Sequence, residues 1–97
     1  MPSKLLKKLK KSVKKMYKVQ IERKVQKKLA KIPSPYFSNI KTAILNLGNN
    51  PRPQGYIKLK GRDAFRIRVA DYRIIYEIQD DVLLVQVINL GHRKDIY

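Results

Sequence analysis

The last seven residues of the chain, GHRKDIY, place several ionisable side chains directly after the apolar run VLLVQVINL. An imidazole titrates near neutral pH, an arginine stays charged, and a phenol can donate or accept a proton. Such groups can hold a phosphate and move protons around it, and here they are His92, Arg93, Lys94 and Tyr97. Because Gly91 follows the apolar run, we expect the strand to end there and these residues to lie on the coil that leaves it.

A second group of cations lies in two stretches that alternate apolar and polar residues. AFRIRVAD carries Arg66 and Arg68 in this alternation, and YRIIYEI carries Arg73. Successive side chains of a strand point to opposite faces, so these arginines should share the face away from the core. Like charges on adjacent antiparallel strands repel, and a bound phosphate would relieve that repulsion. The alternative is an ordinary basic surface that favours solubility or pairs with Glu77.

The elements that must position these residues follow from the hydrophobic period. YKVQIE alternates as a strand does, and RKVQKKLAKI and YFSNIKTAILNLG have helical spacing on either side of PSP. After the turn-rich NNPRPQG the period is two, and YIKLKG should place Ile57 and Leu59 toward the core. The sequence predicts one small α+β domain. An N-terminal strand and a helical hairpin would pack on one face of a mainly antiparallel, twisted sheet of about four to five strands.

Composition limits the class of protein. The chain has 97 residues, 43% of them hydrophobic, which is enough for one domain with a modest core. It has no cysteine, which excludes disulfides, thiolate metal sites and a cysteine nucleophile. No apolar stretch approaches the roughly 20 residues of a membrane span. We expect a cytoplasmic protein that does not associate with membranes.

The charge indicates a polyanionic partner. Lysine and arginine number 23 against 7 acidic residues, a net charge of +16. Residues 1–31 hold 13 of these basic residues and one acid. Such a field attracts nucleic acid and speeds the encounter with it. Residues 1–15 are predicted to be a basic extension, helical or disordered, ahead of a domain that covers residues 16–97.

Two motifs together resemble a known family. KLKGRDAFRIRVADYRIIYEI followed by VINLGHRKDIY resembles the RelE branch of the RelE/ParE toxin superfamily, over about residues 16–97. The resemblance implies a RelE-like toxin of a type II toxin–antitoxin system, held inactive by a RelB-like antitoxin in a hetero-oligomer. It further implies an endoribonuclease, without metal or cofactor, that cleaves messenger RNA in the ribosomal A site. The ribose 2′-hydroxyl would attack the adjacent phosphate.

The resemblance also implies roles for individual residues. It places Arg66, Arg73, Arg93 and Tyr97 in the catalytic set and Lys58 and Arg68 among the RNA-binding residues. To these we add His92 as a catalytic residue, and Lys60, Arg62 and Lys94 as further RNA-binding residues. The best-known members carry lysines where this chain has Arg66 and Arg68. Arginine cannot lose its proton near neutral pH, so these two would be phosphate clamps. Proton transfer then falls to His92 or to Tyr97, which we prefer as the orienting or basic group.

Two other functions are compatible with this sequence. A ParE-like toxin would bind DNA gyrase and would need no acid and base groups. A basic RNA- or ribosome-binding protein without catalysis would explain the strongly charged N-terminal region equally well. For the toxin, we expect an antitoxin segment that is acidic or amphipathic and neutralises the basic face.

Overall fold

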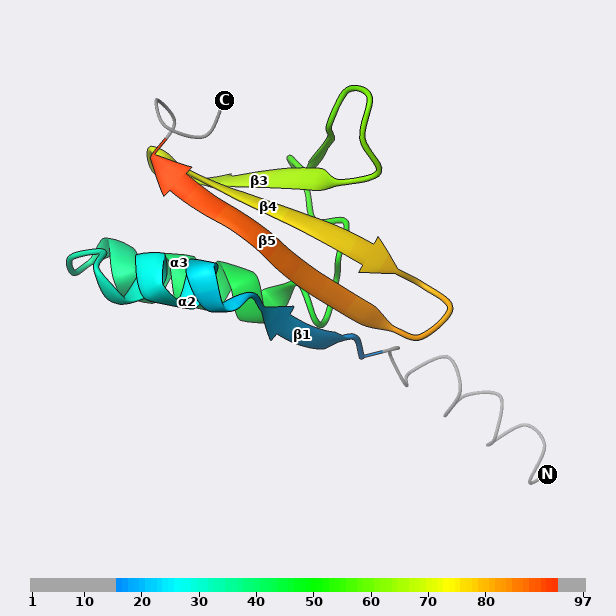
Figure 1. Cartoon of the computed structure of the whole chain (residues 1–97), viewed down its shortest axis with the longest axis horizontal. Helices are drawn as coiled ribbons and strands as arrows, with labels where there is room; N and C mark the ends of the chain where they lie inside the picture. Colours follow the sequence, from blue (N-terminus) through cyan, green and yellow to red (C-terminus); the bar gives the residue numbers. More distant parts are fainter. Residues whose placement is uncertain (1–15, 93–97) are drawn as a thin grey trace, which may run out of the picture.

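The computed structural model describes residues 16–92, which form a five-stranded sheet with two helices against it (Figure 1). The strands are β1 (Lys18–Ile21), β2 (Ile57–Lys58), β3 (Phe65–Val69), β4 (Tyr72–Gln79) and β5 (Leu84–His92), and the helices are α2 (Arg23–Ala30) and α3 (Tyr36–Asn46). The sheet order is β1-β5-β4-β3-β2, with β1 parallel to β5 and the other pairs antiparallel. The predicted α+β class is confirmed. The predicted extension at residues 1–15 lies outside the described residues.

The core lies between the two helices and one face of the sheet. Val25 and Leu29 of α2 and Ile40 and Ile44 of α3 are buried, as their helical spacing predicts. The sheet contributes Ile67, Ile74, Tyr76, Val85, Val87 and Leu90. We call this side of the sheet the helix-covered face and the other side the outer face. Neither of these two helices is long and apolar enough to cross a membrane.

A close approach between the end of α3 and the start of β1 requires a glycine. The backbone N–H of Tyr17 donates to the carbonyl of Gly48 at 2.8 Å. A Cβ atom at position 48 would lie 2.9 Å from the carbonyl oxygen of Tyr17, which is closer than side chains pack. Gly48 therefore lets the N-terminal strand run past the helix to reach β5.

Strand β2 is shorter than the alternation of YIKLKG predicts. It pairs only Ile57 with Arg66 and Lys58 with Phe65, and the chain then turns at Gly61, whose φ is +73°. Directly opposed residues share a face of the sheet, so Ile57 lies on the outer face, where it is 47% exposed. The prediction that Ile57 faces the core is wrong, because this edge strand pairs in a register that turns it outward.

A β-bulge in β5 reverses the faces of the residues that follow it. Val87 pairs with Tyr76 of β4, and Asn89 pairs with the adjacent Ile75. Ile88 is therefore the extra residue of the bulge. The bulge buries Leu90 completely and keeps the polar Asn89 out of the core. The strand then continues to His92, one residue beyond Gly91, where the sequence predicted it to end.

Candidate functional site

The outer face of β3 and β4 carries three arginines side by side. Arg68 lies directly opposite Arg73, and Arg66 lies two residues away from Arg68 on the same face of β3. We call these three residues the arginine face, and the register confirms that they share it as predicted. Directly opposed like charges destabilise a sheet, so folding alone does not favour this arrangement.

The arginine face has an apolar floor. Ile75 lies opposite Arg66 and next to Arg73 along β4, and only 5% of it is exposed. The Nε atoms of Arg66 and Arg73 are buried, as is Nη1 of Arg73, whereas Arg68 is exposed. Where water is partly excluded, the attraction between a guanidinium and an anion is screened less. The face can therefore bind a phosphate more strongly than a fully solvated basic surface could.

Gly91 adds no side chain beside Arg73. It belongs to β5 and lies directly opposite Arg73, so the outer face reads Arg68, Arg73 and Gly91 across three strands. A glycine at this position lets a ligand come close to the backbone and to the neighbouring guanidinium. The prediction that the strand ends at Gly91 is wrong. Gly91 instead lies within the strand, next to a predicted catalytic arginine.

Two predicted site residues lie on the helix-covered side of the sheet instead. His92 is opposite Tyr72, and the two rings meet edge to face with centroids 5.7 Å apart. Lys58 is opposite Phe65, which packs against the core. The prediction that His92 lies on a coil beside the arginines is therefore wrong, because the bulge turns it to the other face.

The remaining predicted site residues lie in a turn or outside the described residues. Lys60 and Arg62 are exposed in the turn between β2 and β3. Arg93, Lys94 and Tyr97 lie outside the described residues, and their roles stay predictions. Over residues 16–92, no group of three or more His, Asp or Glu side chains is arranged to hold a metal ion.

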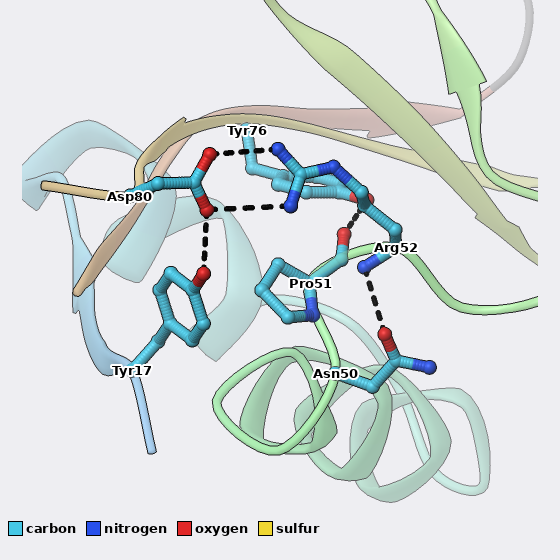
Figure 2. A network of polar contacts seen from close by, with 6 residues as sticks. All are labelled: Tyr17, Asn50, Pro51, Arg52, Tyr76 and Asp80. Carbon is cyan, nitrogen blue, oxygen red and sulfur yellow. Dashed lines mark hydrogen bonds and ion pairs between the residues drawn. The ribbon is translucent and has the colours of Figure 1, made fainter. Parts of the chain in front are cut away.

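A second polar cluster lies at the opposite end of β4 (Figure 2). Asp80 accepts a hydrogen bond from the Tyr17 hydroxyl and two from Arg52, with Nη1 at 3.3 Å and Nη2 at 2.8 Å. The Tyr76 hydroxyl donates to the carbonyl of Pro51 at 2.6 Å. We call these five residues the Asp80 cluster. It ties β1 and the loop after α3 to the turn between β4 and β5.

The contacts of the Asp80 cluster set its ionisation. The hydrogen bond to Asp80 raises the pKa of the Tyr17 phenol, and the hydrogen bond between Arg52 and the same carboxylate raises the pKa of Arg52. Burial raises the pKa of Tyr76 to about 12. At physiological pH the cluster therefore contains one arginine whose positive charge is balanced by Asp80, and two tyrosines in the neutral phenol form. Sequence reasoning missed it, because Tyr17 and Asp80 are 63 residues apart and no local pattern joins them.

Solved toxin structures share this fold. The chain matches the structure of the archaeal RelE–RelB complex from Pyrococcus horikoshii at 28% identity and a TM-score of 0.74, over 82% of this chain and 98% of that one. For the RelB–RelE complex from Methanococcus jannaschii the values are 28%, 0.63, 80% and 94%. For the intact Escherichia coli RelBE complex they are 25%, 0.68, 78% and 95%. A search of curated proteins by sequence finds no match.

The fold of this chain is thus RelE-like. Residues 19–97 also match the family described as the ParE toxin of the type II toxin–antitoxin system parDE. The chain therefore belongs to the RelE/ParE superfamily and is a toxin of a type II toxin–antitoxin system. The three solved relatives are complexes with their antitoxins, which supports an antitoxin partner for this chain.

Proposed function

We propose that this toxin is a ribosome-dependent endoribonuclease that cleaves messenger RNA in the A site and thereby inhibits translation. The arginine face carries the proposal, because Arg68 stands opposite Arg73 with Arg66 nearby on the same side. Guanidiniums grouped in this way fit the oxygens of a phosphodiester better than lysines do. The likeness to solved RelE toxins supports the same activity.

In the proposed reaction, the reacting groups come from the RNA and from side chains of the toxin bound in the A site. The ribose 2′-oxygen attacks the adjacent phosphorus, and the bond from phosphorus to the 5′-oxygen breaks. A base takes the 2′-hydroxyl proton and an acid gives one to the leaving oxygen. The products are a 2′,3′-cyclic phosphate and a 5′-hydroxyl. Fixed cations stabilise the negative charge that develops on the phosphate oxygens.

The roles divide according to what each side chain can do. Arg66 and Arg68 clamp the phosphate, and Arg73 and Arg93 stabilise the transition state. An arginine stays protonated, so none of these four can be the base. Tyr97 is the residue that we assign to orienting or deprotonating the 2′-hydroxyl.

Other residues complete the proposed site. Lys58, Lys60, Arg62 and Lys94 bind the RNA on either side of the cut, as exposed cations can. His92 is the alternative proton carrier. Its position on the helix-covered face makes it second to the terminal tyrosine, because it can reach the phosphate only around the end of the sheet.

The proposed partners follow from this activity. The toxin acts on ribosomes and their messages in the cytoplasm, and no membrane is involved. A RelB-like antitoxin holds it inactive in a hetero-oligomer. We expect the antitoxin to cover the basic surface with an acidic or amphipathic segment, because burying these cations without counter-charges would be unfavourable.

A second candidate is a toxin that inhibits DNA gyrase and has no nuclease activity. The match to a family described as ParE favours it. Gyrase inhibition gives no reason for aligned arginines with an apolar floor, which is why we place it second. A basic RNA- or ribosome-binding protein without catalysis is a third possibility, for which only the net charge of +16 argues.

In vitro translation with the purified toxin distinguishes these functions. We expect discrete new message ends at A-site codons, each with a 5′-hydroxyl on the downstream fragment, and no such ends on the same message without ribosomes. A supercoiling assay with DNA gyrase should show no inhibition. Intact messages together with inhibited gyrase would establish the second candidate, and intact messages on stalled ribosomes would establish the third.

A further inference from the structure

A pocket of about 380 Å³ lies on the helix-covered side, at the end of the sheet nearest the arginine face. This volume is within the range of small-ligand sites. Lys28 of α2 and the last residues of β5 are among the residues that form its walls. The lining residues are Lys28, Lys31, Ile32, Tyr72, Leu90, Gly91 and His92, and none of them is acidic.

Aromatic rings meet at this pocket. Tyr72 and His92 line the pocket with ring centroids 5.7 Å apart, and the Tyr72 ring also contacts the ring of Tyr36, which lies beside the lining residues, at 5.9 Å. Tyr36 is 41% exposed, and Tyr72 and His92 are half-buried. The rings therefore offer flat surface to a ligand at the edge of the core, where the protein already excludes water from one side of the rings.

The same pocket carries positive charge. The Nζ atom of Lys28 donates to Oδ1 of Asn89 at 3.0 Å, which holds this ammonium at the rim. Lys31 is exposed one helical turn further along the chain. Aromatic rings next to lysines are the combination that single-stranded nucleic acid needs, since bases stack and phosphates pair with cations.

We propose that this pocket is a second RNA subsite, which stacks an unpaired nucleobase on the Tyr36, Tyr72 and His92 rings. Lys28 and Lys31 hold the phosphate beside that base. Gly91 lines this pocket and also lies opposite Arg73, so one RNA strand can pass around the end of the sheet from this pocket to the arginine face. The identification of that RNA as message rests on the proposed function, but binding itself does not.

A short RNA that cannot be cut provides the test. A 2′-O-methyl oligonucleotide has no attacking hydroxyl, so its binding is measured whether or not the toxin is a nuclease. A 2-aminopurine in the oligonucleotide reports stacking through loss of fluorescence. We expect Tyr36→Leu to weaken binding about five- to a hundred-fold and to restore the fluorescence, because a stacking ring is lost. Tyr36→Phe should bind as the wild type does.

Tyr56→Leu is the matched control. Tyr56 is 37% exposed and contacts the ring of Phe65 at 5.8 Å, much as Tyr36 contacts Tyr72. It lies at the other end of β3, away from the pocket. This variant should leave the affinity and the quenching unchanged. Lys31→Ala should reduce the slope of log K against log salt by about one, because one phosphate contact is lost.

Two results would overturn the subsite. In the first, Tyr36→Leu binds and quenches the oligonucleotide as the wild type does. In the second, Tyr36→Leu leaves RNA affinity intact but weakens the complex with the antitoxin, which would assign the pocket to that protein. If messages stay uncut in the translation assay while Tyr36→Leu still weakens oligonucleotide binding, only the proposed nuclease activity fails.

Discussion

The two ends of β4 use arginine in opposite ways. Near its C-terminal end, Arg52 meets the carboxylate of Asp80 at 2.8 Å, and the charges cancel. Near its N-terminal end, Arg73 lies directly opposite Arg68, so two guanidiniums share one face of the strand pair. An arginine held by a carboxylate joins parts of the fold, whereas arginines aligned on one face of a sheet offer several hydrogen-bond donors to an anion. The comparison separates residues that build this toxin from residues that should act on its substrate.

The largest expected effect comes from a substitution in the arginine face. Arg66→Ala should lower the rate of message cleavage about 10²–10³-fold, because its guanidinium clamps the phosphate on which negative charge develops during the reaction. Single-turnover cleavage on programmed ribosomes measures it. An unchanged far-UV circular dichroism spectrum should show that the variant is folded. A folded variant that cuts at the wild-type rate would mean that the arginine face is only a solvated surface.

The Asp80 cluster should affect how the stability of the fold depends on pH. The pKa of Tyr76 is raised to about 12 from an ordinary 10.0, so the folded state holds its proton more tightly than the unfolded state. Stability from this group is complete below pH 10 and is lost as pH rises toward 12. The loss should reach about 2–3 kcal/mol. Urea unfolding across this pH range measures it.

Tyr76→Phe is the control for this titration, because it removes the phenol and keeps the ring. The two proteins share every other ionisable group, so the difference between the two curves isolates Tyr76. We expect the wild type to lose more stability than the variant between pH 10 and pH 12. Parallel curves would show that burial does not hold this proton.

The smallest effect should come from the exposed part of the Asp80 cluster. The side chains of Arg52 and Asp80 are 42% and 53% exposed, so solvent screens their attraction. Asp80→Ala should therefore lower the free energy of unfolding by about 1 kcal/mol or less and leave cleavage unchanged. Asp81→Ala removes a neighbouring acid from the same turn and serves as the control. Equal effects of the two variants would show that the ion pair contributes nothing.

The arginine face could be predicted from the sequence because β3 and β4 pair in regular register. AFRIRVAD alternates apolar and polar residues, YRIIYEI does so except at Ile75, and a short turn joins them, so their faces are settled locally. The helices were predictable for a similar reason, since Val25, Leu29, Ile40 and Ile44 repeat at helical spacing. The RelE-like motifs added the family to which this fold belongs.

The positions of Gly91 and His92 could not be predicted in the same way. VLLVQVINL is apolar on both faces, so its sequence does not show that Ile88 forms a bulge. One extra residue exchanges the two faces of everything after it. The Asp80 cluster was also beyond prediction, because it joins β1, a proline-rich loop and a distant turn through side chains. Tertiary packing decides both features.

The comparison of Arg73 with Arg52 tests the central claim most directly, because each alanine variant removes one guanidinium from a different end of β4. The measurement is the single-turnover rate of message cleavage on programmed ribosomes. We predict that Arg73→Ala lowers this rate about 10²–10³-fold and that Arg52→Ala leaves it within about twofold of the wild type. Equal rates for the two folded variants would contradict the assignment of the arginine face as the site that holds the scissile phosphate.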